Sequence, residues 1–331
     1  MNKEPAEARS AVKLPSGVGW TALLTAYGRA QESRQTERLF DDPLAAAFVE
    51  AVNSHGERGD GELPRLGPAV DDDSSTLWTG WRFYFTQRTP FYDQGILGAV
   101  RAGCRQVVLL GAGMDSRAFR LGLPEDLTVF ELDRPAVLDF KQTVLTRRSA
   151  LPTCHRVPLA ADVLADWPTA LSAAGFDAAQ PATWVAEGLL MYLSREDADR
   201  LLDRITALSA PGSRVITEYF GRAWHDSDVV NDSLDSQDWA AWHLVQGGFL
   251  YGPMADQPAA WLSRHGWKPG EITTLAEVGR RSGRVVPPEF GRPGAPDVWL
   301  LDGTYPAGML RSGRAIIRPY PPGEGRRPDA A

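Results

Sequence analysis

The stretch QVVLLGAGMDSR, residues 106–117, combines an apolar run with a glycine-containing turn. The apolar run Gln106–Leu110 predicts a buried strand, and Gly111 and Gly113 follow it directly. Glycine lets the backbone approach a ligand closely, because a Cβ atom would collide with that ligand. This stretch therefore predicts a ligand-binding turn at the carboxyl end of a strand.

Apolar runs and helical segments alternate along the chain after this turn. The runs that predict further strands are residues 128–132, 155–160, 183–186, 213–219, a short stretch near Glu271, and 297–302. One intervening helix is expected to start at Pro135, and another to be capped by Ser194, with Asp197 completing a capping box. This alternation is typical of a mostly parallel sheet covered by helices on both faces. We therefore predict a Rossmann-like α/β fold.

The N-terminal third predicts helices and a loop. Residues 20–53 show a helical spacing of apolar side chains, and residues 54–75 are rich in Gly, Pro and Asp, which predicts a loop. A second helical stretch follows. Thr89 and Pro90 predict the start of a separate helix that ends near Gly103, because proline is favoured at the first helical position.

The chain is expected to form a single domain from residue 18 to residue 305. Residues 18–103 form its helical N-terminal extension in this interpretation. Residues 221–267 interrupt the strand–helix alternation and contain several tryptophans and histidines, so we expect a lid or a substrate-binding insertion. Residues 1–17 and 306–331 are expected to be flexible tails, the latter because it is rich in Pro, Gly and Arg.

Two acidic residues end the second predicted strand. Glu131 and Asp133 stand 20 and 22 residues after Gly111. An acidic residue about 20 positions after a glycine turn commonly binds the ribose hydroxyls of a nucleotide cofactor. The pattern alone does not choose between Glu131 and Asp133.

The third and fourth predicted strands bring further carboxylates to the same edge of the sheet. Asp162 follows the third strand, where it could accept a hydrogen bond from an adenine amino group or cap the following turn. Glu187 follows the fourth strand in an apolar run, and a buried carboxylate needs a partner. That partner is either the amino group of a cofactor's methionine moiety or an arginine, Arg88 or Arg117.

The turn favours S-adenosylmethionine over a dinucleotide. Ser116 occupies the third glycine position of the dinucleotide motif, and Asp115 would repel a pyrophosphate group at this helix start. S-adenosylmethionine carries no phosphate and has a positively charged sulfonium, which suits an acidic turn. We therefore assign Gly111, Gly113 and Asp115 to an S-adenosylmethionine site, with an NAD-dependent reductase as the alternative.

Several segments together resemble the leucine carboxyl methyltransferase family. They are VVLLGAGMDSRAFRL at 107–121, FELDRP at 130–135, WVAEGLLMYLSREDADRLL at 184–202, ESRQTERLFDDPLA at 32–45 and RTPFYD at 88–93. They look especially like the bacterial branch of S-adenosylmethionine-dependent O-methyltransferases, which includes polyketide carboxyl O-methyltransferases. The resemblance covers roughly residues 20–280.

The resemblance implies a class I methyltransferase fold with a helical N-terminal extension and a lid over the substrate. It also implies cofactor contacts: Arg88 with the carboxylate of the cofactor, Gly111 with its methionine portion, Asp133 with the ribose, Asp162 and Val163 with the adenine, and Glu187 with the methionine end. Asp133 is thus favoured over Glu131 by the resemblance.

The chemistry of methyl transfer sets what the protein must add. The cofactor supplies the leaving group, and the protein supplies position and electrostatics. A carboxylate acceptor, with a pKa of about 4, needs no base at neutral pH, whereas a phenol, with a pKa of about 10, would benefit from one. His225, His243 and His265 lie in the 221–267 segment, and His243 is the best placed of them. Tyr192 and His243 are therefore our candidate catalytic residues.

Composition narrows the partners. The 331 residues carry a net charge of −7, which disfavours a sequence-independent nucleic-acid binder. The sequence contains neither an apolar run of about 18 residues nor an N-terminal signal core, so we expect a cytoplasmic protein without membrane contact. We expect no metal.

The functional hypothesis from the sequence is an O-methyltransferase that acts on a small-molecule carboxylate or hydroxyl in natural-product (polyketide) biosynthesis. A protein C-terminal carboxylate is the alternative acceptor.

Overall fold

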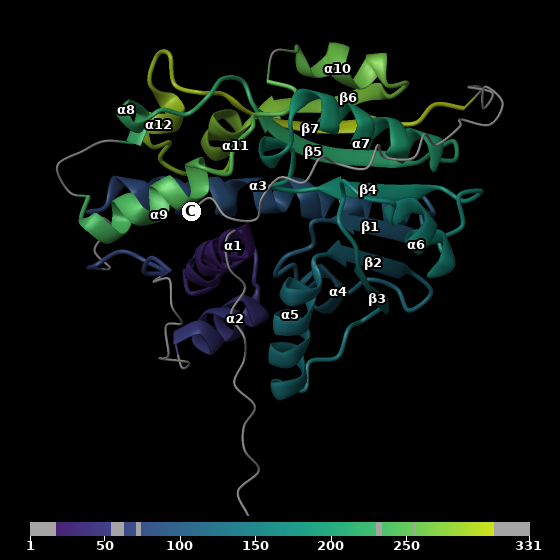
Figure 1. The fold of residues 1–331 in the computed structure, drawn as a ribbon, viewed down its shortest axis with the longest axis horizontal. Helices are drawn as coiled ribbons and strands as arrows, with labels where there is room; N and C mark the ends of the chain where they lie inside the picture. The colour runs from purple at the N-terminus through teal and green to yellow at the C-terminus, as the bar shows by residue number, and fades with distance from the viewer. Residues whose placement is uncertain (1–17, 54–62, 71–73, 230–233, 255, 308–331) are drawn as a thin grey trace, which may run out of the picture.

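The computed structural model describes residues 18–53, 63–70, 74–229, 234–254 and 256–307 (Figure 1). The predicted tail at 1–17, most of the tail at 306–331 and parts of the 54–75 loop lie outside the described residues. The core is a seven-stranded sheet in the order β3-β2-β1-β4-β5-β7-β6. Its strands are β1 Gln106–Leu110, β2 Thr128–Asp133, β3 His155–Ala160, β4 Ala182–Ala186, β5 Arg214–Phe220, β6 Lys268–Thr274 and β7 Val298–Thr304.

The first five strands pair in parallel, and β7 runs antiparallel to its neighbours β5 and β6. The predicted boundaries of the strands differ from these by at most two residues. Strand order reverses between β1 and β4, where Leu109 pairs with Val185. Ligands of open α/β sheets bind at such a switch point, outside the carboxyl ends of the strands. The predicted Rossmann-like α/β fold is confirmed.

Helices cover both faces of the sheet. They are α1 Val18–Ser33, α2 Pro43–Asn53, α3 Thr76–Arg101, α4 Arg117–Arg120, α5 Pro135–Arg147, α6 Trp167–Ala173, α7 Arg195–Ala207, α8 Asp226–Val229, α9 Ser236–Gln246, α10 Pro258–Arg264, α11 Leu275–Arg281 and α12 Pro288–Gly291, with a 3-10 turn η1 at Leu190–Tyr192. Because successive strand residues point to opposite faces, Val108 and Leu110 pack on α6, α7 and α10, whereas Val107 and Leu109 pack on α3 and α4.

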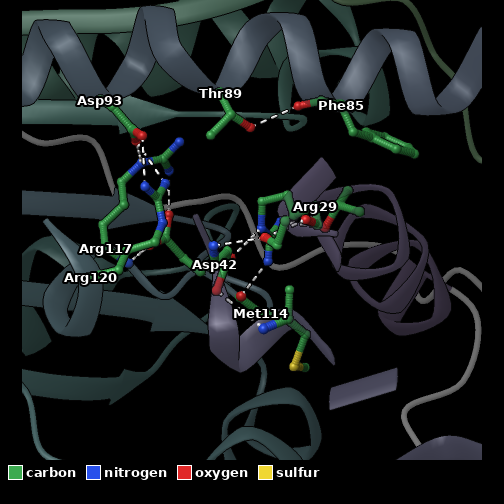
Figure 2. Close-up of polar contacts among 12 residues, drawn as sticks. Arg29, Asp42, Phe85, Thr89, Asp93, Met114, Arg117 and Arg120 are labelled. Atoms are coloured by element: carbon green, nitrogen blue, oxygen red, sulfur yellow. Dashed lines mark hydrogen bonds and ion pairs between the residues drawn. The ribbon is translucent and has the colours of Figure 1, made fainter. Parts of the chain in front are cut away.

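Helix α3 corrects one prediction. Thr89 and Pro90 do not start a separate helix, because one continuous helix runs through both residues. Proline lacks the N–H that would bond the carbonyl of residue 86. The Thr89 hydroxyl donates to the Phe85 carbonyl at 2.7 Å, and 15 residues of the helix are buried (Figure 2). Tertiary packing thus holds the helix together across the proline.

Helices from distant parts of the sequence gather at one end of the sheet. Helices α8, α9 and α12 lie at the left of Figure 1, and α1 and α2 lie below and to the right of α9. A separate apolar cluster joins α1 and α2 to α5. The Asp42 carboxylate caps α2 by accepting from the Ala45 N–H at 3.1 Å, and the Ser194 hydroxyl caps α7 by accepting from the Asp197 N–H at 3.1 Å.

In the described part of the chain, no helix has both the length and the apolar character that a membrane crossing requires.

Candidate functional site

A cavity of about 330 Å³ opens at the carboxyl ends of β1, β2, β3 and β4. One half of its wall contains the glycine turn after β1 and the residues that follow β2 and β3. We call this the turn half. The other half, which we call the aromatic half, is lined by Leu77, Gly80, Trp81, Tyr84, Phe85, Tyr192, Phe220, Trp224, Val229, Trp242, Val245, Phe249, Glu289 and Phe290. The sheet thus brings a polar turn and an apolar chamber into one cavity.

The glycine turn has a backbone that favours glycine. Gly111 and Gly113 have φ angles of 68° and 46°, in the left-handed region that other residues rarely adopt. A Cβ atom on Gly113 would lie 3.1 Å from the Cβ atom of Ala22 in α1. The turn is therefore closely covered by the first helix.

Asp133 lies at the cavity, and Glu131 does not. One Asp133 carboxylate oxygen accepts from the Gly113 N–H at 2.6 Å, and the other accepts from the Arg134 N–H at 2.7 Å. Burial raises the pKa of Asp133, although these amides act against that rise. Glu131 is fully buried and pairs with Lys141 at 2.8 Å. The structure thus places Asp133, of the two acids that the pattern left open, beside the glycine turn.

Asp162 and Val163 line the cavity after β3. The Asp162 side chain is exposed, and its carboxylate accepts from the Leu164 N–H at 2.8 Å. Asp162 therefore caps the following turn, which was one of its two predicted roles. Its position on the cavity wall leaves the adenine contact as a prediction.

Glu187 is held by both of the arginines that the sequence offered as partners. Its carboxylate lies 3.0 Å from Arg88 Nε and 2.7 Å from Arg117 Nη1. Burial alone would raise the pKa of Glu187, but Arg117 and Arg88 lower it below its ordinary value. Glu187 is thus an ionised carboxylate that faces the cavity from a compensated network.

Arg117 also compensates Asp115. The two side chains form an ion pair, and the Asp115 carboxylate accepts from the Arg117 N–H at 2.7 Å. Despite burial, Arg117 lowers the pKa of Asp115 to about 2. Figure 2 shows Arg117 and Arg120 converging on Asp93, where the Arg117 distance is 2.7 Å. Because Arg117 offsets the charge of Asp115, this carboxylate repels an anion less than an unpaired carboxylate would.

Glu218 on β5 supports the site through its ion pair with Arg88, and it was not predicted from the sequence. It is fully buried, pairs with Arg88, and accepts from the Tyr84 hydroxyl at 2.6 Å and from the Gly188 N–H at 3.0 Å. Burial raises the pKa of Glu218, while Arg88 acts in the opposite direction. An acid inside the apolar run 214–220 is the same signal that singled out Glu187, so it was available in the sequence.

Helix α1 forms part of the wall through Thr21, Ala22, Leu24, Thr25 and Arg29. Arg29 is buried, although it is a cation. It pairs with Asp42 at 2.8 Å and donates to the Met114 carbonyl of the glycine turn at 2.6 Å (Figure 2). This contact connects α1 and the cap of α2 to the turn, a link between distant segments that the sequence pattern does not predict.

The two candidate catalytic residues have different positions. Tyr192 lines the cavity, with its ring 5.3 Å from that of Phe249, and burial raises its pKa to about 12. At neutral pH it is therefore a neutral hydroxyl. His243 does not line the cavity: its side chain is 57% exposed and lies 3.7 Å from Asp226. We therefore withdraw His243 as a catalytic candidate, because it is Trp242 of the same helix that lines the cavity.

The other described histidines also lie away from the cavity wall. His225 is exposed, and the buried His265 pairs with Asp199 and Asp203. Trp224 and Trp242 line the cavity and also belong to a buried apolar cluster.

Comparisons with known proteins agree on one family. The family model for leucine carboxyl methyltransferase matches residues 22–206. A relative from Parafrankia sp. (strain EAN1pec), described as a candidate S-adenosyl-L-methionine-dependent methyltransferase, is 42% identical over 269 residues, which cover 80% of this chain and 82% of the relative. A relative with the same description from Mycobacterium tuberculosis (strain ATCC 25618 / H37Rv) is 42% identical over 272 residues, 79% of this chain and 87% of its own.

A solved structure, a candidate methyltransferase from Thermobifida fusca YX, is 18% identical with a TM-score of 0.49. The match covers 86% of this chain and 94% of that one.

Proposed function

Because the chain belongs to the leucine carboxyl methyltransferase family and is an S-adenosylmethionine-dependent methyltransferase with a Rossmann-like fold, we propose that it methylates an oxygen atom of a small molecule. The accepting group in this proposal is a carboxylate or a hydroxyl, and the reaction belongs to natural-product (polyketide) biosynthesis. The observation that supports this proposal is that the turn half and the aromatic half belong to one cavity. Two reactants can meet there, one in each half. Family membership sets the NAD-dependent alternative aside.

The turn half fits the cofactor in shape and charge. Its glycines line the cavity with backbone and no side chain, and its carboxylates Asp133 and Asp162 line the cavity as hydrogen-bond acceptors for hydroxyl and amino groups. Within the proposal, Gly111, Gly113 and Asp115 form the turn beneath the methionine portion. Asp133 binds the ribose, and Asp162 with Val163 holds the adenine.

The remaining cofactor contacts in the proposal come from Arg88 and Glu187. Arg88 binds the carboxylate of the methionine moiety, and Glu187 accepts from its amino group. Arg88 already lies between Glu187 and the fully buried Glu218, so its guanidinium is oriented before a ligand arrives. Such prior orientation reduces the entropy that binding costs.

The chain's own residues position and enclose the acceptor. When bound, S-adenosylmethionine supplies an electrophilic methyl group and its leaving group. The aromatic half excludes water and holds an apolar acceptor beside the turn half, and such alignment can contribute on the order of 7–11 kcal/mol to the reaction. The insertion predicted at 221–267 contributes Trp224, Trp242 and Phe249 to this wall, which supports its role as the substrate-binding segment.

Replacing Asp133 with asparagine tests the proposal. Titration calorimetry should show S-adenosylhomocysteine bound more weakly by about 1 kcal/mol or more, because one charged hydrogen bond is lost. Asp126→Asn is the matched control, since the Asp126 side chain is 68% exposed and lies outside the cavity wall. An unchanged affinity in Asp133→Asn would remove Asp133 from the site. A screen of carboxylate and hydroxyl acceptors with methyl-labelled cofactor then tests the acceptor class.

A further inference from the structure

Glu289 stands apart from the other groups in the aromatic half. It lies on α12 and is 8% exposed, between Gly80 of α3 and the aromatic rings of that half. A Cβ atom on Gly80 would overlap with Glu289 Oε1, so the missing side chain makes room for the carboxyl group. Among the described residues it is the only carboxylate in the aromatic half.

The Glu289 carboxyl has no side-chain partner in the described part of the chain. It accepts only from its own backbone N–H, and Arg292 acts on it electrostatically while pairing with Asp228 at 3.0 Å. Burial raises the pKa of Glu289 above its ordinary value. One hydrogen bond from its own backbone leaves most of the acceptor capacity of this buried carboxyl unused, because a carboxylate has about four lone-pair sites.

Four other charged groups of the cavity wall have partners within the protein. Arg88, Asp115 and Glu187 each form ion pairs, and Asp133 accepts from two backbone amides. Each of these groups is already held by a charged side chain or by backbone amides, whereas Glu289 is held only by its own backbone. Glu289 therefore has hydrogen-bonding capacity left for a molecule in the aromatic half.

We propose that Glu289 selects the methyl acceptor by accepting a hydrogen bond from a hydroxyl group on a flat aromatic molecule. This inference rests on the proposed function and narrows its acceptor class. The rings that line the aromatic half, which include Trp81, Trp224 and Phe290, provide apolar faces for such a molecule. The ionised form of Glu289 would repel an acceptor that carries a carboxylate at this position.

Four probes of similar shape test the inference against protein saturated with S-adenosylhomocysteine. They are 2-naphthol, 2-methoxynaphthalene, 2-naphthoate and 2-naphthylmethylamine, and calorimetry measures their affinities. For the natural sequence we expect 2-naphthol to bind about tenfold or more tightly than its methyl ether, since the ether has no hydroxyl hydrogen to donate to Glu289. The 2-naphthoate anion should bind weakly.

In Glu289→Gln the advantage of 2-naphthol over the ether should shrink and the affinity for 2-naphthoate should rise. Glu277→Gln is the matched control, because the Glu277 side chain on α11 is 48% exposed and lies outside the cavity wall. It should behave like the natural sequence. Gly80→Ala is a second variant, and it should also reduce the discrimination by displacing the Glu289 carboxyl.

Several results would overturn the inference. They are equal binding of 2-naphthol and its ether by the natural sequence, preferred binding of the naphthoate or the amine, no binding of any probe, or unchanged affinities in Glu289→Gln. We would first measure the binding of S-adenosylhomocysteine to the unmodified protein and to each variant. This measurement distinguishes a failure of the inference from a failure of the proposed function. If the unmodified protein does not bind S-adenosylhomocysteine, the proposed methyltransferase function is contradicted instead. If only a variant fails to bind S-adenosylhomocysteine, the inference is judged from the affinities of the four probes for the unmodified protein.

Discussion

At the residue scale, the site is an arrangement of buried charges that form ion pairs with one another. Arg88 lies between Glu187 and Glu218, and Arg117 pairs with Asp115 and with Glu187. Removing one partner of a buried pair leaves an uncompensated charge, which costs far more than the pair contributes. Each of these residues therefore affects stability as well as binding.

Glu218→Gln is expected to lower the free energy of unfolding by about 3 kcal/mol, because it removes one of the two carboxylates that hold Arg88. Chemical denaturation measures this loss. Glu196→Gln is the control, since the Glu196 side chain on α7 is 79% exposed and should contribute less than about 1 kcal/mol. A loss of similar size in the two variants would show that the Arg88–Glu218 pair is not important for stability.

At the element scale, sequence patterns predicted the strands better than the helices. Short, continuous apolar runs such as 106–110 mark strands that are buried on both faces, and these runs end where the burial ends. Helix α3 was divided in the prediction because proline usually starts or ends a helix. Packing against the sheet overrides that local preference, and no local pattern shows such packing.

Helices α7 and α10 are connected by a histidine. His265, directly after α10, lies 2.6 Å from Asp203 and 3.1 Å from Asp199, both on α7. Burial lowers the pKa of His265, but Asp203 and Asp199 outweigh burial and raise it above its ordinary value. The folded protein therefore binds the proton more tightly than the unfolded chain. This stabilisation is complete below about pH 6.5 and is lost as the pH rises through the raised folded value.

His265→Gln should accordingly destabilise the protein more at pH 6 than at pH 9. We expect a difference of about 1 kcal/mol in the free energy of unfolding, kept small because the Asp203 side chain is 67% exposed. Denaturation at the two pH values measures it. Leu151→Gln, which changes an uncharged and 83% exposed side chain, should show no such pH dependence. An equal loss at both pH values in His265→Gln would mean that the proton does not contribute.

At the scale of the whole molecule, the cavity wall is assembled from segments that are far apart in the sequence. The carboxyl ends of the parallel strands were predictable as the place of the site, because the topology of an open α/β sheet determines it. The contributions of Arg29 and Glu289 were not, since each depends on how a distant helix packs. His243 was misplaced for the same reason, because the pattern of α9 does not show which of its faces meets the cavity.

Hydrogen exchange should distinguish the two halves of the cavity. S-adenosylhomocysteine should slow amide exchange in α1, whose Ala22 covers the glycine turn and whose Arg29 contacts it. Exchange in α9, which lines the aromatic half through Trp242 and Val245, should slow mainly when an acceptor is added. Helix α6 contributes no residue to the described wall and serves as the control. Equal protection of α1 and α9 by S-adenosylhomocysteine would contradict this division.

The spread of the wall along the chain has a consequence for biosynthesis. Thr21 and Phe290 both line the cavity, although 269 positions separate them in the sequence. A nascent polypeptide on the ribosome lacks one side of the chamber until residue 290 has emerged. The chamber therefore stays incomplete, and methylation cannot begin, until translation has passed residue 290.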